Sequence, residues 1–506
     1  MLIVVWCGAM KKRNVLLVNP NQMKPPVTPV ALDYLAQSLE EKGFAAEVLD
    51  LAFSLDAEAD IRSALKGSES LLIGVTVRNL DDSYLASQDF CLARTKGIID
   101  LIRAYSQSPL VLGGVGFSIS PEAVLSYCEV DLGIRGEGEQ ALPLLAKRLG
   151  EGGPLEGIPG LVFKEGRNFR RNRMHWFALQ DADLSSRTAL DHGRYLREGG
   201  MVGFESKRGC DQGCIFCADP IAKGKKVRLR DPAQVAEELV RLYGKGIDHF
   251  HTCDSEFNVP EAHGIQVCRE IVRRGLGDKI RWFAYLAPQP FSEELAIWMR
   301  RAGCVGIDFG MDHGNEAMLK ALGRSHTPQD IRRIARLARE LGFSLLFDLL
   351  LGGPGETRKT LKAAIQLMNE ASPDRVGISL GVRIYPGTRL FGQIKGQGPW
   401  RKNPHLRGTV EANPGCLRPL FYLSADLGED IDDYIDELIG SDERFLFGNR
   451  KRVDRNYNYN DNSVLAKAIA DGHRGAFWDI LKRISSPAHS CSQPSRRNPA
   501  THRVWP

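Results

Sequence analysis

The chain has 506 residues, of which 43% are hydrophobic and 25% are charged, so it can bury the cores of about two to four globular domains. Its formal net charge of +5 is small for this length, and acidic residues are interleaved with the basic ones, which gives no reason to expect a nucleic-acid partner. The 11 cysteines in so long a chain do not fit a disulfide-stabilised secreted domain.

The first apolar run, residues 2–6, is too short to span a bilayer. Lys11, Lys12 and Arg13 follow it, which is the reverse of the order found in a signal peptide. We therefore expect residues 1–11 to be a leader outside the folded domains. Since no other long apolar run occurs, the expected location is the reducing cytoplasm, where thiols stay reduced.

Residues 12–150 alternate short apolar runs with amphipathic segments. Leu32, Ala36 and Leu39 share one face of a predicted helix that ends at Gly43. Strands that alternate with helices predict a Rossmann-like, doubly wound parallel sheet, whose ligand crevice lies at the carboxyl ends of the strands. The predicted strands are residues 14–20, 46–51, 71–77, 110–112 and 131–134.

Glycines follow the fourth of these strands, in the segment 113–118, and allow a ligand to approach the backbone closely. A tight turn between strand and helix would explain the same glycines. Together with residues 118–122 and 135–139, however, this segment resembles the cobalamin-binding domain that precedes the radical S-adenosylmethionine (SAM) domain in many enzymes. The resemblance covers most of residues 12–150. It implies cobalamin contacts at Gly113, Gly114, Ser118 and Glu137.

One loop departs from that family. Cobalamin domains that ligate cobalt from below carry Asp-x-His-x-x-Gly after the first strand, whereas residues 19–24 read Asn-Pro-Asn-Gln-Met-Lys, without a histidine. The lower axial position is then empty, filled by water or approached by another residue, or else no cobalamin binds. Arg78, after the third strand, is placed to line that lower face. An ordinary loop cation paired with Asp81 or Asp82 is the alternative.

Residues 151–197 are irregular and are predicted to be a linker. A second alternation then predicts a partial (β/α)6 barrel over residues 198–395, with its chemistry at the carboxyl ends of the strands. Two of its helices have clear start signals, at Asp231-Pro232 and Thr327-Pro328. The six predicted strands are residues 201–204, 247–250, 280–285, 305–309, 345–350 and 376–380.

Cys210, Cys214 and Cys217 follow the first barrel strand as Cys-x3-Cys-x2-Cys. Structural zinc needs four closed ligands, for which only distant residues such as His249 and His251 could be recruited. Three thiolates suit an iron–sulfur cluster in which one iron stays open to another ligand. With Phe216 before the last cysteine, the triplet resembles that of radical SAM enzymes, which implies a [4Fe–4S] cluster whose fourth iron holds SAM and which cleaves it to a 5′-deoxyadenosyl radical.

The loops after the later barrel strands match the same family in order. Glu256, for example, could accept a hydrogen bond from the SAM amino group. Turn geometry would by itself explain polar residues and glycines at strand ends. The resemblance implies SAM contacts at Phe216, Asp254, Glu256, Asn258, Asp308 and Gly353.

Tyr285, at the end of the third barrel strand, is a candidate donor of a proton or hydrogen atom, with a core aromatic role as the alternative. Residues 396–484 are predicted to be a small, mostly helical cap that selects substrate. Residues 485–506 are rich in Ser, Pro, Arg and Asn and are predicted to be a disordered tail. The expected fold class is therefore α/β, with a Rossmann-like cobalamin domain, a radical SAM barrel and this C-terminal region.

The resemblance implies a cobalamin-dependent radical SAM C-methyltransferase that acts on an unactivated carbon of a small-molecule substrate and takes electrons from a donor such as flavodoxin or ferredoxin. A cyclase or rearrangement enzyme with the same two domains is one alternative. An RNA-modifying radical SAM enzyme is another, but it would need a second three-cysteine cluster near the N-terminus. Cys91 and Cys128 are too few and too dispersed for that cluster.

Overall fold

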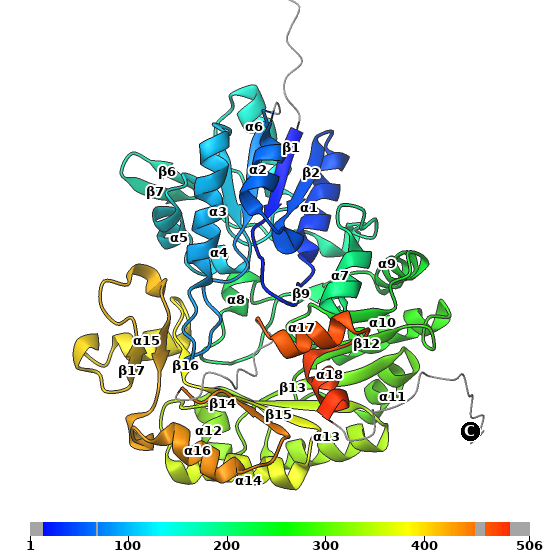
Figure 1. The fold of residues 1–506 in the computed structure, drawn as a ribbon, viewed down its shortest axis with the longest axis vertical. Coiled ribbons are helices and arrows are strands. Elements are labelled where there is room, and N and C mark those ends of the chain that lie inside the picture. The colour runs from blue at the N-terminus through cyan, green and yellow to red at the C-terminus, as the bar shows by residue number, and fades with distance from the viewer. Residues whose placement is uncertain (1–13, 67–68, 451–460, 486–506) are drawn as a thin grey trace, which may run out of the picture.

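The computed structural model of this chain describes residues 14–66, 69–450 and 461–485 (Figure 1). The predicted leader, residues 1–11, lies outside the described residues, as does the predicted tail from residue 486 onward. No helix in the described ranges is both long and apolar enough to cross a membrane.

The N-terminal domain is built on a seven-stranded sheet in the order β2-β1-β3-β4-β5-β6-β7. The five strands predicted from the sequence are confirmed, and they pair in parallel. The strands are β1 (Asn14–Asn19), β2 (Ala45–Asp50), β3 (Leu72–Thr76), β4 (Leu110–Gly113), β5 (Leu132–Ile134), β6 (Leu161–Glu165) and β7 (Asn168–Arg171).

Helices cover both faces of this sheet. Because side chains alternate along a strand, Val15 and Leu17 of β1 pack against one helical layer and Leu16 and Val18 against the other. The first layer contains α1 (Val30–Glu41) and α6 (Ala141–Glu151), and the second contains α2 (Ala57–Leu65), α3 (Cys91–Tyr105) and α5 (Pro121–Cys128). This arrangement is the doubly wound sheet that the sequence predicts.

The segment 151–197 contains more regular structure than the predicted linker. Strands β6 and β7 form a hairpin that continues the sheet in antiparallel pairing, and Leu161, Val162 and Phe163 of β6 are buried. The apolar run in β6 is only three residues long, and charged residues follow it. A run this short does not predict a strand from the sequence alone. The segment ends in η2 (Leu179–Asp181) and α7 (His192–Gly199).

The second domain contains a parallel sheet in the order β19-β15-β14-β13-β12-β11-β8, which forms the partial barrel. The six predicted strands are confirmed, and β19 adds a seventh at the edge, paired to β15. The strands are β8 (Val202–Phe204), β11 (His249–Thr252), β12 (Arg281–Leu286), β13 (Cys304–Asp312), β14 (Ser344–Leu351), β15 (Arg375–Leu380) and β19 (Phe445–Phe447).

The barrel helices begin where their capping residues predict. The Asp231 side chain accepts a hydrogen bond from the backbone N–H of Ala233, and Thr327 forms a reciprocal capping box with Asp330. The helices are α8 (Asp219–Ala222), α9 (Pro232–Gly244), α10 (Glu261–Arg273), α11 (Glu293–Arg301), α12 (Glu316–Ala321), α13 (Pro328–Glu340), α14 (Arg358–Ala371) and α15 (Arg389–Lys395).

The C-terminal region contains more strand than the predicted helical cap. A small antiparallel sheet forms in the order β16-β18-β17, beside several 3-10 turns. These elements are β16 (Val382–Arg383), β17 (Leu406–Gly408), β18 (Leu420–Tyr422), α16 (Ile431–Ile439), α17 (Ser463–Ala470) and α18 (Phe477–Ser485).

Helices α17 and α18 lie between the N-terminal domain and the barrel sheet (Figure 1). Trp478 of α18 packs edge-to-face on Phe283 of β12, with ring centroids 5.8 Å apart. Both side chains lie on the face of the barrel sheet that the outer helices leave uncovered. Helix α18 therefore fills part of the barrel interior.

A group of buried charges joins the two domains, and we call it the interdomain ion cluster: Asp33 of α1, Arg187 of the connecting segment, and Arg230 and Glu238 at α9. Arg187 Nε lies 2.7 Å from Asp33 Oδ2, and its Nη1 contacts Glu238. Arg230 Nη1 lies 2.6 Å from Glu238 Oε2, and all four side chains are fully buried. Buried charges persist only when each has a partner, so this cluster fixes one domain against the other.

Candidate active site between the two sheets

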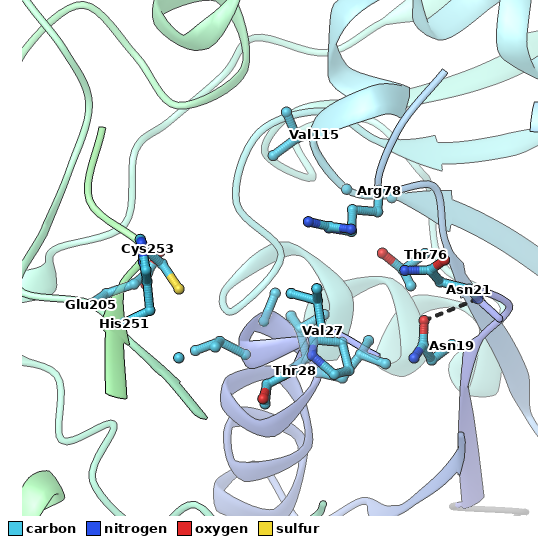
Figure 2. A pocket seen from close by; sticks show the side chains of 18 of the residues that line it. Asn19, Asn21, Val27, Thr28, Thr76, Arg78, Val115, Glu205, His251 and Cys253 are labelled. Atoms are coloured by element: carbon cyan, nitrogen blue, oxygen red, sulfur yellow. Dashed lines mark hydrogen bonds between the residues drawn. The ribbon is translucent and has the colours of Figure 1, made fainter. Parts of the chain in front are cut away.

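The carboxyl ends of the two parallel sheets face a shared cavity of about 500 Å³. Asn19, Thr76 and Gly113 line it from the ends of β1, β3 and β4, while Glu205 and Tyr285 line it from the ends of β8 and β12. Figure 2 shows Arg78 and Val115 on one side of this space and His251 and Cys253 on the other. The cavity therefore lies where both folds place their ligand sites.

Gly113 and Gly114 form part of the cavity wall, as predicted for a ligand cradle. Gly114 has φ +102°, and a Cβ atom there would lie 2.6 Å from the carbonyl oxygen of Val77. Only glycine fits this position without strain. Ser118 is buried beside it, donates to the carbonyl oxygen of Gly114 at 2.8 Å and accepts from the N–H of Gly136 at 2.9 Å. Its hydroxyl thus joins two loops of the cavity wall.

We expect Gly114→Ala to destabilise the protein by about 1–3 kcal/mol, because the side chain meets backbone in a left-handed conformation. Gly97→Ala in α3 is the matched control, since nothing lies within 4 Å of a Cβ there. That change should stabilise by up to about 1 kcal/mol. Thermal unfolding of both variants checks the pair, and equal melting temperatures would contradict the steric argument.

Arg78 follows β3 and projects into the cavity (Figure 2). Its Nη1 lies 3.0 Å from the sulfur of Met23, in the loop after β1 where some cobalamin domains place a histidine. Asp81, one of the two carboxylates considered as its partner, is bound by Arg383 at 2.6 Å across the domain joint. Arg78 therefore lies on the cavity wall beside the loop that follows β1, and its contact with the lower face of a ligand stays a prediction.

Glu137 lines the cavity, but its carboxylate is held by the protein. It lies 2.6 Å from Arg228 Nη1, accepts from the backbone N–H of Phe177 at 2.7 Å and contacts Arg208. Arg208 and Arg228 belong to the short strands β9 (Lys207–Arg208) and β10 (Arg228–Leu229) beside the cysteine loop. Glu137 therefore ties the cavity loop of the first domain to the barrel.

Cys210, Cys214 and Cys217 lie on one loop between β9 and α8, and all three are free thiols. The backbone N–H of Cys210 donates to Gly224 at 3.0 Å, and the N–H of Ile215 donates to Leu322 at 3.0 Å. Burial raises the pKa of Cys210 to about 11, so a nearby cation or metal is needed to hold the thiolate.

The described part of the chain contains no three His, Cys, Asp or Glu side chains that converge on a single metal ion. Structural zinc requires such convergence of four ligands. The thiolates of an iron–sulfur cluster each bind a different iron, so they do not need to meet at one point. Three thiolates on one loop suit such a cluster.

Burial raises the pKa values of two predicted SAM contacts, Glu256 and Asp308, and the charge of Glu256 adds to the rise at Asp308. Burial raises the pKa of Glu256 to about 7, against the opposing charge of Arg324. Burial, followed by the charge of Asp348, raises the pKa of Asp308 well above its usual value. Buried carboxyl groups with raised pKa values are typical of functional sites. Neither of these two residues is among those that line the shared cavity.

Asp254 and Asn258, predicted as SAM contacts, have their polar atoms engaged by the protein. Asp254 accepts hydrogen bonds from the Ser206 N–H at 2.8 Å and the Ser206 hydroxyl at 2.5 Å. Asn258 donates to the Ala287 carbonyl at 2.8 Å and accepts from the Ala287 N–H at 3.0 Å. Both therefore shape the loop that carries Glu256.

The two remaining predicted contacts are Phe216, within the cysteine loop, and Gly353, in the loop after β14. Phe216 is partly buried against the cluster that includes Val382 and Ile384. Gly353 follows β14, and its N–H donates to Glu356 Oε2 at 3.1 Å. Glu356 also accepts a hydrogen bond from the N–H of Gly352, so its carboxylate holds the loop closed.

Tyr285 faces the cavity and is 41% exposed, so the core-aromatic alternative is wrong. Its ring lies 4.6 Å from that of His251, a cavity residue that sequence analysis considered only as a zinc ligand. His251 Nδ1 must donate to the Thr252 carbonyl, 2.6 Å away, because that oxygen can only accept. Burial lowers the pKa of His251 to about 4, so the ring is neutral at pH 7.

Helix α17 and the start of α18 complete the cavity wall with apolar side chains, including Leu465, Ile469 and Trp478. Sequence analysis predicted a cap in this region, with Trp478 among its aromatic residues, but did not identify Leu465 or Ile469. The spacing of apolar residues in α17 indicates an amphipathic helix, but it does not show which cavity the apolar face of that helix lines.

The radical SAM superfamily model matches residues 204–368, and the B12 binding domain model matches residues 21–146. The chain is 31% identical to tryptophan 2-C-methyltransferase from Streptomyces laurentii, over 93% of this chain and 96% of that protein.

Two solved structures of the radical SAM methyltransferase TsrM from Kitasatospora setae have the same overall fold. One, with tryptophan and the SAM analogue aza-SAM bound, is 31% identical with a TM-score of 0.86 and covers 94% of this chain and 99% of its own. The other, with cobalamin and a [4Fe–4S] cluster bound, is 31% identical with a TM-score of 0.85 and covers 94% and 98%.

Proposed function

Because this chain belongs to the cobalamin-dependent radical SAM methyltransferases, we propose that it methylates a ring carbon of an indole-containing small molecule, with tryptophan as the first candidate. The protein is a C-methyltransferase that uses a [4Fe–4S] cluster, SAM and cobalamin. The cyclase and RNA-modifying alternatives are not favoured, since the relatives that cover more than nine tenths of the chain are methyltransferases.

One observation carries the proposal: a single cavity reaches from the glycine wall of the first domain to the rim of the barrel. We assign Gly113, Gly114 and Arg78 to cobalamin, with Ser118 and Glu137 shaping the loops behind them. When bound, cobalamin carries the methyl group, and the cluster with SAM supplies methyl donation and one-electron chemistry.

On the barrel side, we assign the three cysteines to the cluster. Glu256, Asp308 and the loop at Gly353 would contact SAM, because buried carboxylates and backbone groups suit its amino group and ribose hydroxyls. Asp254 and Asn258 act behind this surface by holding the Glu256 loop in place.

The substrate would occupy the space beside Tyr285 and His251. The rings of Tyr285 and His251, inclined at 58° to each other, and the apolar side chains Leu465 and Ile469 favour a flat, largely apolar molecule. Neutral His251 presents Nε2 as a hydrogen-bond acceptor, which matches the N–H of an indole. The helices from the C-terminal region exclude water from this space when the cavity is filled.

The cluster would need a low-potential electron donor such as flavodoxin or ferredoxin. All nine cysteines in the described part of the chain are free thiols. This supports the reducing cytoplasm as the location, because thiolates stay available for iron there.

The test is anaerobic purification with cobalamin supplied, followed by analysis of iron, sulfide and cobalt. The loaded protein is then given tryptophan and SAM with a deuterated methyl group, and products are analysed by mass spectrometry. We expect tryptophan that carries one labelled methyl group. Iron without cobalt would contradict the cobalamin assignment, and deoxyadenosine without any methylated product would favour a cyclase or rearrangement enzyme.

We expect Arg78→Ala to reduce methyl transfer by about 10–100-fold, because water gains access to the lower face of bound cobalamin. The visible spectrum of the bound cobalamin should change in parallel. Arg62→Ala, at an exposed position on α2, is the control and should match the wild type in both readouts. An Arg78→Ala protein with an unchanged spectrum and rate would show that this arginine does not face cobalt.

A further inference from the structure

Arg324 contacts one of the three cysteines from a distant part of the chain. Its Nη1 donates to the sulfur of Cys214 at 2.9 Å, and its Nη2 donates to the carbonyl oxygen of Gly310 at 2.6 Å. The side chain is only 7% exposed. A buried guanidinium needs polar partners, and the Cys214 sulfur is one of those that Arg324 has.

The backbone before Arg324 is fixed to the cysteine loop. The carbonyl oxygen of Leu322 accepts from the N–H of Ile215 at 3.0 Å. Gly323 has φ +78°, and a Cβ atom there would lie 2.1 Å from the carbonyl oxygen of Gly213. Arg324 is therefore held against the loop by close backbone contacts rather than by the reach of a flexible side chain.

Two carboxylates face the same guanidinium. Asp312 Oδ2 lies 3.0 Å from Arg324 Nε, and Glu256 Oε1 lies 4.0 Å from Nη1. Asp312 has φ +56° and follows an irregularity in the pairing of β13 with β14. A strained backbone at a charged residue is most often retained for function, and here it places the Asp312 carboxylate beside Arg324.

We propose that Arg324 raises the reduction potential of the cluster by donating a hydrogen bond to the Cys214 sulfur and placing a positive charge beside it. Arg324 acts through the cysteine, so it is a positioning residue and not a catalytic one. The inference rests on the proposed function only in requiring a cluster on the three cysteines.

The direction of the shift in reduction potential follows from the change in the charge of the cluster. Reduction adds one electron from a low-potential donor such as dithionite, and the cluster becomes more negative. A cation and a hydrogen bond at sulfur stabilise the reduced state more than the oxidised one, which raises the reduction potential.

The guanidinium of Arg324 keeps its proton throughout. Burial opposes its positive charge, but the Asp312 carboxylate and its neighbours hold the pKa of Arg324 above its usual value. The negative charge of Asp312 partly neutralises the guanidinium, so Asp312 weakens the effect of Arg324 on the potential of the cluster.

The experiment measures the midpoint potential of the reconstituted cluster without SAM, by redox titration followed by electron paramagnetic resonance. We expect Arg324→Gln to reduce the equilibrium constant for one-electron reduction about tenfold, which is a lower potential by about 59 mV. Asp312→Asn should shift the potential the opposite way, because it leaves the cation unneutralised. Arg324→Lys keeps the charge and should lie between Arg324→Gln and the wild type. Arg336→Gln, at an exposed position on α13, should match the wild type.

If the variants bind iron like the wild type and neither Arg324→Gln nor Asp312→Asn shifts the potential, the proposal is overturned. If Arg324→Gln fails to load iron, the midpoint potentials of Asp312→Asn and Arg324→Lys test the proposal instead. Wild-type potentials in both variants would overturn the proposal. SAM affinity, measured separately by calorimetry, identifies the other role: lost affinity at an unchanged potential assigns Arg324 to SAM alone. A wild-type protein that binds no cluster would instead overturn the proposed function.

Discussion

Replacing Cys217 with alanine will leave a protein that folds but binds no stable cluster, and methyl transfer will fall to the background rate. The cysteine loop offers three thiolates, and the removal of one leaves two corners of the cube without protein ligands. The cofactors supply the bond-making chemistry, so no side chain in the cavity can replace the cluster. Iron and sulfide analysis of the anaerobic protein, together with the methyl-transfer assay, measures this result.

Cys268→Ala is the matched control. Cys268 is a fully buried thiol on α10 in the barrel core, whereas Cys217 is half-buried. Its replacement should cost about 1 kcal/mol of stability and leave the iron content unchanged. A Cys217→Ala protein with wild-type iron would refute the assignment of the triplet, and zinc in place of iron in the wild type would revive the structural-zinc alternative.

Arg187→Met will reduce the free energy of unfolding by about 3–5 kcal/mol, because it removes a cation from a buried group of charges. In the wild type, burial alone would raise the pKa of Asp33, but a hydrogen bond to His192 and the charge of Arg187 hold it below its usual value. In the variant, Asp33 loses its nearest guanidinium in a position without solvent. Methionine keeps much of the side-chain volume, so the loss reports charge more than packing.

Denaturant unfolding of Arg187→Met is best compared with that of Arg194→Met. Arg194 lies on α7, close in the sequence, and forms an ion pair with Glu198 in which both side chains are more than 40% exposed. An exposed pair contributes about 0–1 kcal/mol, so this control should unfold almost as the wild type does. Equal stability of the two variants would show that the interdomain ion cluster does not hold the domains together.

The strands of both sheets could be predicted because each is a continuous apolar run between turn residues. The segments that were missed have weak local patterns. Strand β19 has only three apolar residues, Phe445 to Phe447, and its place in the sheet depends on pairing with β15, far away in the sequence. The β6–β7 hairpin is similar, since its charged second half resembles a surface loop.

The residues of the candidate site also fall into those that could be predicted from the sequence and those that could not. The cysteine triplet could be recognised because its ligands lie within eight residues of one another. A sequence cannot show whether a polar side chain at a strand end points into a cavity or binds a neighbouring backbone, and Asp254 and Asn258 do the second. Arg324 could not be found at all, since it meets Cys214 only after the chain has folded across 110 residues.

Helix α18 has a consequence for biosynthesis. Trp478 covers Phe283 on the inner face of the barrel sheet, and the two residues are far apart in the order of synthesis. While the ribosome still holds this part of the nascent chain, every barrel strand from β8 to β19 has already been made, but the interior lacks this indole ring. The final packing of the barrel interior therefore follows the synthesis of every barrel strand.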